Sequence, residues 1–376
     1  MSKIPRKKYV FTALFCAFFF VISIWTAFGP KSDYSVNEKR FYAKFPKITA
    51  ESVVSGEFRD GLEKYVSDHI LGRDLFVGVN SYFSFLMGRN TLNSIYNCSD
   101  GYLINAPKET DTKIFEKNIE RFNSFTNTVK IPSTLLMVPS NGYIMYDKLP
   151  RFHESYIDDS LYTTADELTP DMGMIDPRKV LINGKSYGQI CYKTDHHITS
   201  LGNYKMYDLY CSVNGIACPD ESRYEKRSYG GFYGTAWSGS GYWLSPADSI
   251  ELWELGDDIS VTISDAGEKE IKSDSLFFTD KLNSIDKYPV FLGGNHSLVK
   301  IENPNAAEGN LLIIKDSYAQ CFAAFLSHNY KNIYLVDLRY YRDNMSEFVR
   351  EKNIDEILYM YGTDTLLTDT NSAWLY

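Results

Sequence analysis

Two short stretches of the chain hold residues whose types suit acyl transfer. In the stretch from Lys193 to Gly202 (KTDHHITSLG), Asp195 stands two residues before His197, and far downstream Ser317 follows the apolar run at 311–314. A carboxylate, an imidazole and a serine hydroxyl are the components of a nucleophilic triad, in which the carboxylate orients the imidazole and the imidazole activates the hydroxyl. The sequence therefore offers Asp195, His197 and Ser317 as candidate catalytic residues.

Each member of this candidate triad has an alternative role. On an extended segment Asp195 and His197 would point the same way and His196 the other way, but an Asp-His-His run also suits a metal site or a solvated loop. The sequence lacks the Asp-x-Asp clusters that manganese-dependent phosphoesterases add to such a run, so we expect no metal. Ser317 stands where a strand should end and a helix begin, at the edge where α/β active sites form. Asp316 or Ser317 could equally be the helix N-cap.

A glycine-rich stretch at 291–296 (FLGGNH) is a candidate oxyanion site. Two glycines let the backbone approach a ligand closely, and the side-chain amide of Asn295 can donate a hydrogen bond to a developing oxyanion. The backbone N–H of Ser317, at the start of the expected helix, could donate a second one. An ordinary Gly-Asn turn is the alternative for Asn295.

The elements that must position these residues alternate between strand and helix. Short apolar runs predict strands at 134–138, 310–314, 332–336 and 357–361, and helical periodicity predicts helices at 57–85 with a break at Gly72, at 113–129, from about Thr199 to Asn214, at 317–328 and at 345–352. This alternation indicates an α/β fold whose mostly parallel sheet is covered on both faces. Residues 220–290 are instead rich in Gly, Ser and aromatics, with alternating stretches such as 259–263, and predict an antiparallel β insertion.

The N-terminal segment has the pattern of a membrane anchor. Four basic residues within positions 3–8 precede an uncharged run from Tyr9 to Phe28 that is long enough to cross a bilayer as a helix. This order predicts an N-terminus inside the cell and the remaining chain outside it. A cleaved signal peptide is the alternative, because 27–29 is a small-x-small site, although Pro30 directly follows it. We expect a tail at 1–8, an anchor at 9–28, a helical lead-in at 29–112 and the α/β domain at 113–376.

Composition narrows the classes of partner. The chain has 376 residues and a formal net charge of -9, which argues against nonspecific binding to nucleic acid. Tyr and Trp suit carbohydrate clefts, and Trp237, Trp243 and Tyr233 lie among glycines in the expected insertion, so we take them as candidate substrate-binding residues, with core packing as the alternative. Cys211 and Cys218 bracket a turn and could pair, but the five cysteines after the anchor are odd in number and free thiols are favoured.

Taken together, these stretches resemble the DHHW protein family and, through it, the SGNH-like domains of the alginate O-acetyltransferase group. Most of the part after the anchor takes part in the resemblance. The matching stretches are 37–40, 44–46, 65–68, 73–74, 138–139, 148–150, Tyr192 to His197, Phe232 to Gly234, Gly293 to Asn295, Lys315 to Ser317 and Tyr334 to Tyr341. The chain departs from the pattern at Ile198, where the motif has Trp, at Lys315, where esterases usually have Gly, and at 238–241 (SGSG), where a Ser-Lys-Ser-Gly-like pattern is expected.

The resemblance implies an SGNH-hydrolase-like three-layer α/β/α fold. It assigns Asp195 as orienter, His197 as base and Ser317 as nucleophile, with Asn295 as an oxyanion donor. It further implies an O-acetyltransferase or acetylesterase that acts on cell-surface or exported polysaccharide without a cofactor. A transferase would need an acetyl donor outside the cell, and hence a membrane-bound O-acyltransferase partner. A noncatalytic glycan-binding or assembly protein with the same fold is the alternative function.

Overall fold

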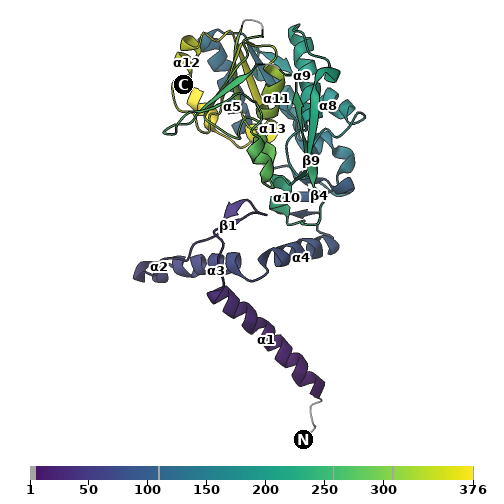
Figure 1. Ribbon diagram of the computed structural model, residues 1–376, viewed down its shortest axis with the longest axis vertical. Coiled ribbons are helices and arrows are strands. Elements are labelled where there is room, and N and C mark those ends of the chain that lie inside the picture. The colour runs from purple at the N-terminus through teal and green to yellow at the C-terminus, as the bar shows by residue number, and fades with distance from the viewer. Residues whose placement is uncertain (1–5, 109–110, 257, 307–308, 376) are drawn as a thin grey trace. The chain divides into compact units, whose positions relative to one another are not determined.

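The computed structural model describes residues 6–108, 111–256, 258–306 and 309–375 (Figure 1). The chain divides into two compact units, of which the first comprises residues 1–89 and 238–243 and the second comprises 90–237 and 244–376. Residues 90–112, which we expected in the helical lead-in, lie in the second unit. That unit carries the strands and helices around the candidate triad.

The first unit is helical and begins with α1 (Arg6–Phe28). Its 20-residue stretch Tyr9–Phe28 is long and apolar enough to cross a membrane. The short strands β1 (Tyr34–Ser35) and β2 (Arg40–Phe41) and the helices α2 (Ala50–Ser55), α3 (Glu57–His69) and α4 (Arg73–Leu86) follow. The predicted break between α3 and α4 falls at Gly72, whose φ of 74° is a left-handed conformation that glycine adopts without strain.

The second unit is built on an eight-stranded sheet in the order β11-β10-β12-β14-β13-β15-β6-β7. Neighbours from β14 to β7 are parallel, whereas β12, β10 and β11 extend the sheet in antiparallel fashion beyond β14. The strands predicted from apolar runs are confirmed and lie side by side in the sheet. The bounds are β6 (Ser133–Val138), β7 (Gly173–Ile175), β10 (Ser260–Ser264), β11 (Ile271–Ser273), β12 (Leu298–Glu302), β13 (Asn310–Lys315), β14 (Asn332–Val336) and β15 (Glu356–Gly362).

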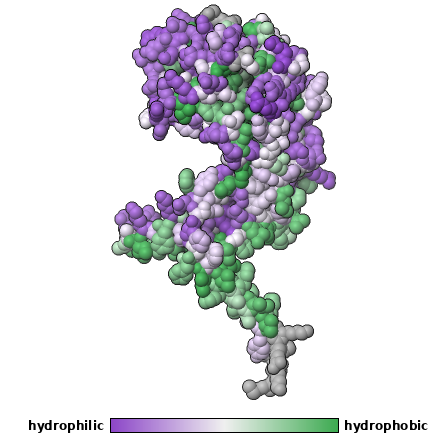
Figure 2. Space-filling view, viewed as in Figure 1, coloured by the Kyte–Doolittle hydropathy of each residue, from purple (hydrophilic) through white to green (hydrophobic). Residues whose placement is uncertain are grey.

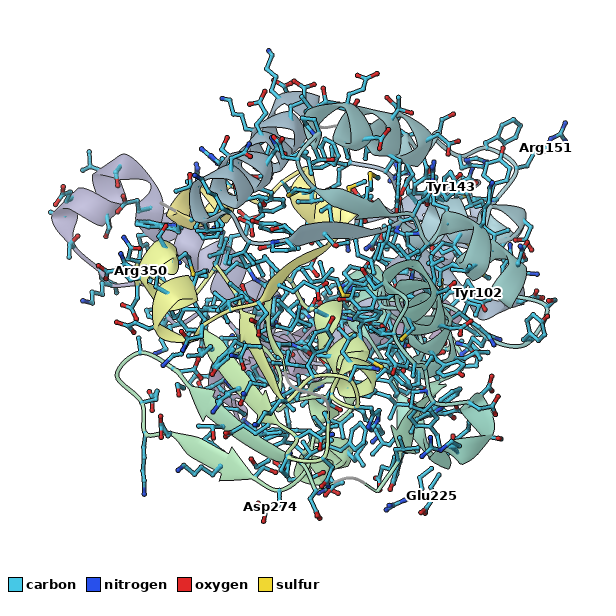
Figure 3. All side chains as sticks on the ribbon, turned by 90° about the horizontal axis from the view of Figure 1, so that it is seen from above. Tyr102, Tyr143, Arg151, Glu225, Asp274 and Arg350 are labelled. Atoms are coloured by element: carbon cyan, nitrogen blue, oxygen red, sulfur yellow. The ribbon has the colours of Figure 1, made fainter. Side chains whose placement is uncertain are left out.

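Side chains from the two faces of this sheet enter two hydrophobic cores, and they fill the space between sheet and helices (Figure 3). On β13, Ile313 belongs to the core covered by α9 (Ser200–Asn214) and α11 (Ala319–Leu326). Its neighbours Leu312 and Ile314 belong to the core covered by α5 (Thr112–Val129), α7 (Asp158–Leu168) and α12 (Met345–Glu351). Strands that are apolar on both faces are what a doubly covered parallel sheet requires, and the predicted three-layer α/β/α class is confirmed.

Capping residues set the ends of the helices that frame the candidate site. The Thr199 hydroxyl accepts a hydrogen bond from the Gly202 N–H (3.3 Å) at the start of α9, and Gly215 ends that helix with a φ of 65°. At the start of α5, the Asp111 carboxylate accepts from the Lys113 N–H (3.0 Å). The remaining elements of this unit are β3 (Thr91–Leu92), β4 (Ile95–Asn97), β5 (Leu103–Asn105), α6 (Asn141–Ile144), α8 (Arg178–Gly184) and α13 (Thr363–Leu366).

The segment at 220–290 contains antiparallel strands, as predicted, but it is not a single insertion. The strands β8 (Glu225–Phe232) and β9 (Asp248–Glu254) form a separate two-stranded sheet, and α10 (Thr235–Ser240) lies between them in the sequence. The strands β10 and β11 belong to the main sheet instead. Alternation of buried and half-buried residues in β10 correctly indicated a strand, but the pattern of one strand does not identify the strand with which it pairs.

The six cysteines all lie within the described residues and are free thiols. Cys211 and Cys218 therefore do not form the bridge that their spacing allowed. Burial raises the pKa of Cys321, on α11, to about 12. A thiol in that state is protonated at neutral pH and is a poor nucleophile.

Candidate active site

Ser317 lies in the turn between β13 and α11, and Asp316 holds that turn in place. The Asp316 carboxylate accepts hydrogen bonds from the backbone N–H groups of Tyr318 (2.9 Å) and Gly362 (2.9 Å). The Asp316 N–H in turn donates to the carbonyl of Met360 (3.2 Å). Asp316 thereby holds the turn before α11, whose N-cap is Tyr318 without a side-chain cap bond, and ties this turn to the end of the neighbouring strand. The hydroxyl of Ser317, which is half-buried, is not used as a cap.

Residues 193–197 form a bent loop whose base is an antiparallel bridge. Cys191 pairs with Ile198, and the Tyr192 N–H donates to the His197 carbonyl (3.2 Å). Ile198, which replaces the tryptophan of the family motif, is 1% exposed and lies in the core with α9. The bridge reverses the direction of the chain, and Asp195 and His197 lie in the loop between the two bridged residues.

The buried carboxylate of Asp248 holds this loop. It is 3% exposed and accepts hydrogen bonds from the backbone N–H groups of Lys193 (2.9 Å) and Thr194 (2.7 Å), from the Thr194 hydroxyl (2.6 Å) and from the Gln189 side chain (2.7 Å). Asp248 opens strand β9, far from the loop in sequence. Sequence reasoning missed it, because an aspartate at the start of a strand carries no sign of such a long-range role.

The three candidate side chains form one hydrogen-bonded chain. His197 Nδ1 bonds the Oδ1 atom of Asp195, and His197 Nε2 lies 2.8 Å from the Oγ atom of Ser317. A carboxylate can only accept hydrogen bonds, so Nδ1 carries the ring hydrogen and Nε2 accepts from the Ser317 hydroxyl. In that tautomer the imidazole can take the serine proton.

Asp195 is 2% exposed, and its hydrogen bonds keep it charged. Its carboxylate also accepts from the His197 N–H (3.0 Å), the Thr235 N–H (2.7 Å) and the Thr235 hydroxyl (3.0 Å). Burial alone would raise the pKa of Asp195, but the electrostatic interactions with the two neighbouring histidines and these hydrogen bonds outweigh it and hold the pKa well below its ordinary value.

Gly234 and Thr235, which complete the environment of Asp195, come from the turn after β8. A Cβ atom on Gly234 would lie 2.1 Å from the Cβ atom of Asp195, so only glycine fits there. The stretch from Phe232 to Gly234 was part of the family resemblance, but its contact with Asp195 was not foreseen. The useful signal was the glycine itself, because an obligate glycine often marks a close approach of two backbone segments.

Tyr288 packs against the imidazole of His197. Its ring stacks on His197 with the ring centroids 3.7 Å apart and the planes 12° apart. Its hydroxyl donates to the Ser317 carbonyl (3.3 Å). Tyr288 therefore contacts both His197 and Ser317. The sequence contains 29 tyrosines, and nothing distinguished this one.

His196 does not point away from His197, so that expectation was wrong. The two ring centroids lie 3.9 Å apart, and His196 Nδ1 lies 2.6 Å from the Thr235 hydroxyl oxygen. Side-chain alternation applies to extended strands, whereas residues 193–197 form successive bends. Burial, together with the electrostatic interaction with His197, lowers the pKa of His196 to about 4, which leaves a neutral imidazole at neutral pH.

The run Asp195 to His197 offers three ligand atoms within 4.8 Å of one another, a spacing that a metal ion could use. In this structure His197 Nδ1 is bonded to Asp195, and His196 Nδ1 is bonded to Thr235. A metal ion could use those nitrogen atoms only by displacing these partners. The arrangement is thus better suited to orienting His197 towards Ser317 than to coordination.

Asn295 lies on a glycine-rich loop before β12. Gly293 and Gly294 have φ values of 79° and 111°, which other residues adopt only with strain. The Asn295 amide oxygen accepts from the side chain of Gln320 (2.7 Å), in the first turn of α11. This bond turns the amide so that its NH2 group is the part able to donate elsewhere. Within the described residues the Ser317 N–H donates to no other group, and the oxyanion role of both groups stays a prediction.

The three aromatic candidates differ in their placement. Tyr233 is half-buried, with its ring centroid 4.4 Å from that of Trp237. Trp237 is 5% exposed, and its backbone N–H donates to the Thr194 carbonyl (3.0 Å), so it offers little surface to a ligand. Trp243 packs within the first unit, where its indole N–H donates to the Asp74 carbonyl (2.8 Å). Their role in substrate binding stays a prediction.

A cavity of about 550 Å³ borders Asp248. It is lined by aromatic and charged residues that include Tyr187, Trp253 and Lys226, a mixture that suits a sugar. Neither Ser317 nor the two other triad side chains line it. We therefore assign no step of the reaction to this cavity.

Comparisons with known proteins assign a family to the part of the chain that holds the candidate triad. Residues 179–336 match the model of the family described as DHHW protein. They form a DHHW-family region. It contains Asp195, His197 and Ser317, and the resemblance noted in the sequence is confirmed. A comparison with curated proteins finds no significant match.

Solved structures share the fold of the DHHW-family region and its surroundings. A DHHW family protein from Eubacterium siraeum aligns with a TM-score of 0.64 at 20% identity, covering 76% of this chain and 95% of that chain. Bacillus cereus PatB1 aligns with a TM-score of 0.62 at 18% identity, covering 72% of this chain and 97% of that chain. A second PatB1 structure, with a sulfonyl adduct, aligns with a TM-score of 0.62 at 19% identity, covering 74% and 98%. Likeness at this level of identity establishes the fold and leaves the activity to be argued from the site.

Proposed function

We propose that the chain is a membrane-anchored, extracytoplasmic enzyme that transfers or removes acetyl groups on cell-surface or exported polysaccharide. The observation that carries the proposal is the chain of hydrogen bonds from Asp195 through His197 to Ser317, at the carboxyl edge of a parallel sheet. The charged carboxylate, the tautomer it imposes and the stacked Tyr288 ring all serve one end, which is to hold His197 Nε2 ready to accept the serine proton.

The reaction follows from these contacts. His197 Nε2 takes the Ser317 hydroxyl proton while Oγ attacks the acetyl carbonyl carbon, and the carbonyl oxygen gains the negative charge. The Ser317 N–H and the Asn295 amide are the proposed donors to that oxygen. His197 then gives its proton to the departing alkoxide, which leaves an acetyl ester on Ser317. An incoming hydroxyl repeats the sequence in reverse and regenerates the serine.

The nature of the incoming hydroxyl decides between the two activities. A sugar hydroxyl gives an O-acetyltransferase, and water gives an acetylesterase. Helix α1 is long and apolar enough to hold the enzyme at a membrane, and the basic residues before it favour a catalytic domain outside the cell. If the activity is acetyl transfer, an acetyl donor is needed outside the cell, and we infer that a membrane-bound O-acyltransferase partner supplies it.

Reaction with a sulfonyl fluoride tests the nucleophile directly, and the sulfonyl adduct in PatB1 motivates this probe. The purified full chain should gain one sulfonyl group on Ser317 and lose its hydrolysis of p-nitrophenyl acetate. Ser317→Ala should show neither labelling nor turnover. Ser284→Ala, at an exposed serine, is the matched control and should behave as wild type.

Two results would overturn the proposal. A folded wild-type protein that is inert towards acetyl esters and unlabelled at Ser317 would favour the noncatalytic glycan-binding alternative. An activity that survives Ser317→Ala but disappears with a chelator would instead favour a metal site at Asp195, His196 and His197, whose ligand atoms lie within 4.8 Å of one another.

A further inference from the structure

Helix α4 carries its large apolar side chains on the outside. Leu75, Phe76, Val79, Phe83 and Leu86 are all exposed, Leu86 to 80% of its surface. Their spacing of three and four residues places them on one face of the helix. Between Asp74 and the end of the helix there is no charged residue. An isolated exposed apolar residue needs no explanation, but a contiguous stripe of this kind marks a surface that meets another apolar phase.

The opposite face of α4 is made of small residues, and it is the face that packs on protein. Gly78, Ser81 and Ser84 are the buried residues of the helix. The Ser81 hydroxyl donates to the Ser240 carbonyl (3.1 Å), and a Cβ atom on Gly78 would lie 2.8 Å from the Trp243 ring. The helix is therefore inverted relative to an ordinary surface helix, which buries its large apolar residues and exposes its polar ones.

We propose that the outer face of α4, formed by Leu75, Phe76, Val79, Phe83 and Leu86, is seated in the interface of a lipid bilayer. The helix belongs to the same compact unit as α1, which is itself long and apolar enough to span a membrane. Hydrophobic residues gather over α1 and along the lower edge of α4 (Figure 2). A membrane surface is thus already within reach of α4. A helix of 14 residues would lie along it over about 21 Å.

The exposed apolar residues of the two units support a lipid rather than a protein occupant. In the second unit they are scattered singly, as on most soluble domains. In the first unit the segment after α1 exposes further large apolar residues outside α4, among them Phe41, Ile48 and Val54. An extended apolar surface next to a membrane span is the arrangement of an interfacial anchor. This inference does not depend on the triad.

The test places spin labels on the full chain in nanodiscs of phosphatidylcholine and phosphatidylglycerol, loaded with one copy per disc. In a background with Cys16→Ser and Cys218→Ser, labels are attached at Val79→Cys and Leu86→Cys. Glu63→Cys, at an exposed position on α3, is the matched control. Paramagnetic relaxation should show the first two labels accessible to oxygen and shielded from a water-soluble nickel chelate, and the control label the reverse.

Two outcomes would overturn the inference. If the labels at Val79→Cys and Leu86→Cys are as accessible to the nickel chelate as the control, the face is in water. If they are shielded from both oxygen and nickel, and only when two copies share a disc, the occupant is a second copy of the chain. Because both positions are exposed, unchanged thermal unfolding of the labelled variants should establish that the fold is intact.

Discussion

Asp195→Asn tests the charge and the accepting oxygens of the carboxylate while it keeps nearly the same side-chain shape. The carboxylate accepts four hydrogen bonds, two on each oxygen: Oδ1 from His197 Nδ1 and the His197 N–H, and Oδ2 from the N–H and hydroxyl of Thr235. An asparagine has one accepting oxygen and one NH2 group. Whichever way the amide turns, its NH2 group meets a backbone N–H that previously had an acceptor.

The two orientations of the amide have different chemical consequences. If the NH2 group faces His197, Nδ1 must accept, so Nε2 carries the hydrogen and cannot take the proton of Ser317. If it faces Thr235, the productive tautomer survives but the imidazolium formed in the reaction loses its counter-charge. In a serine hydrolase triad the corresponding change lowers kcat by roughly 10⁴. We expect a loss of roughly 10² to 10⁴, or about 3 to 5 kcal/mol in the activation free energy.

The assay is hydrolysis of p-nitrophenyl acetate by the purified full chain, with thermal unfolding measured on the same samples. Thr235→Val is the companion variant: it removes one of the two bonds to Oδ2 and should cost about 1 kcal/mol, or roughly fivefold in kcat. Thr235→Ser, which keeps the hydroxyl, should have a kcat close to that of the wild type. The double variant of Asp195→Asn with Ser317→Ala should be no slower than Ser317→Ala alone. A folded Asp195→Asn protein with kcat within threefold of wild type would refute the reasoning.

Four further substitutions test the surroundings of the triad. Asp248→Asn places an NH2 group opposite hydrogen-bond donors of the triad loop. It should lower kcat with little change in KM, and it should lower the free energy of unfolding in urea by about 2 to 4 kcal/mol. An unchanged kcat would show that Asp248 does not position the loop. Asp337→Asn should lower the free energy of unfolding by about 3 to 5 kcal/mol, because it leaves the buried ammonium of Lys315 without its counter-charge. Lys315→Met should lower it by about 1 kcal/mol. The reverse order would contradict the ion-pair argument. The fall in the pKa of His196 from 6.5 to about 4 corresponds to about 3 kcal/mol, which its 30% exposure reduces to about 1 to 2. The folded state disfavours the imidazolium, so stability should fall as the pH drops from 6.5 towards 4. This fall should be smaller in His196→Gln, and in the control His153→Gln it should be as large as in the wild type.

Much of the fold was readable from the sequence because its signals are local. The central strands β6, β13, β14 and β15 are unbroken apolar runs bounded by polar residues, and α9 has a threonine cap at one end and a glycine at the other. Such features depend on a few neighbouring residues. The partner of β10 was not readable, because an alternating strand fits any sheet edge that offers a matching face.

The candidate site divides along the same line. Asp195, His197 and Ser317 could be named from their types, spacing and family resemblance. Thr235 and Tyr288, which contact the carboxylate and the imidazole, follow Asp195 by 40 or more residues and lie in segments that carry no pattern of their own. The prediction that His196 points away from His197 was wrong for a local reason, because the loop bends where an extended segment was assumed. Residue type and spacing thus identified the three residues of the candidate triad, whereas the residues that position them could be found only from the fold.

Lys315 shows how a departure from a family pattern is explained by its contacts. It stands two residues before Ser317, where esterases usually have glycine, and a lysine there suggests a charge offered to the substrate. The side chain is instead 1% exposed, with Nζ 3.4 Å from an oxygen of Asp337, which is also bound by the Arg339 guanidinium (2.9 and 2.6 Å). Burial lowers the pKa of Lys315, and Asp337 provides the opposite charge that an ammonium needs there. Because the Lys315 ammonium pairs with Asp337, the departure changes how the end of β13 is held and does not bear on the proposed roles of Ser317, His197 and Asp195.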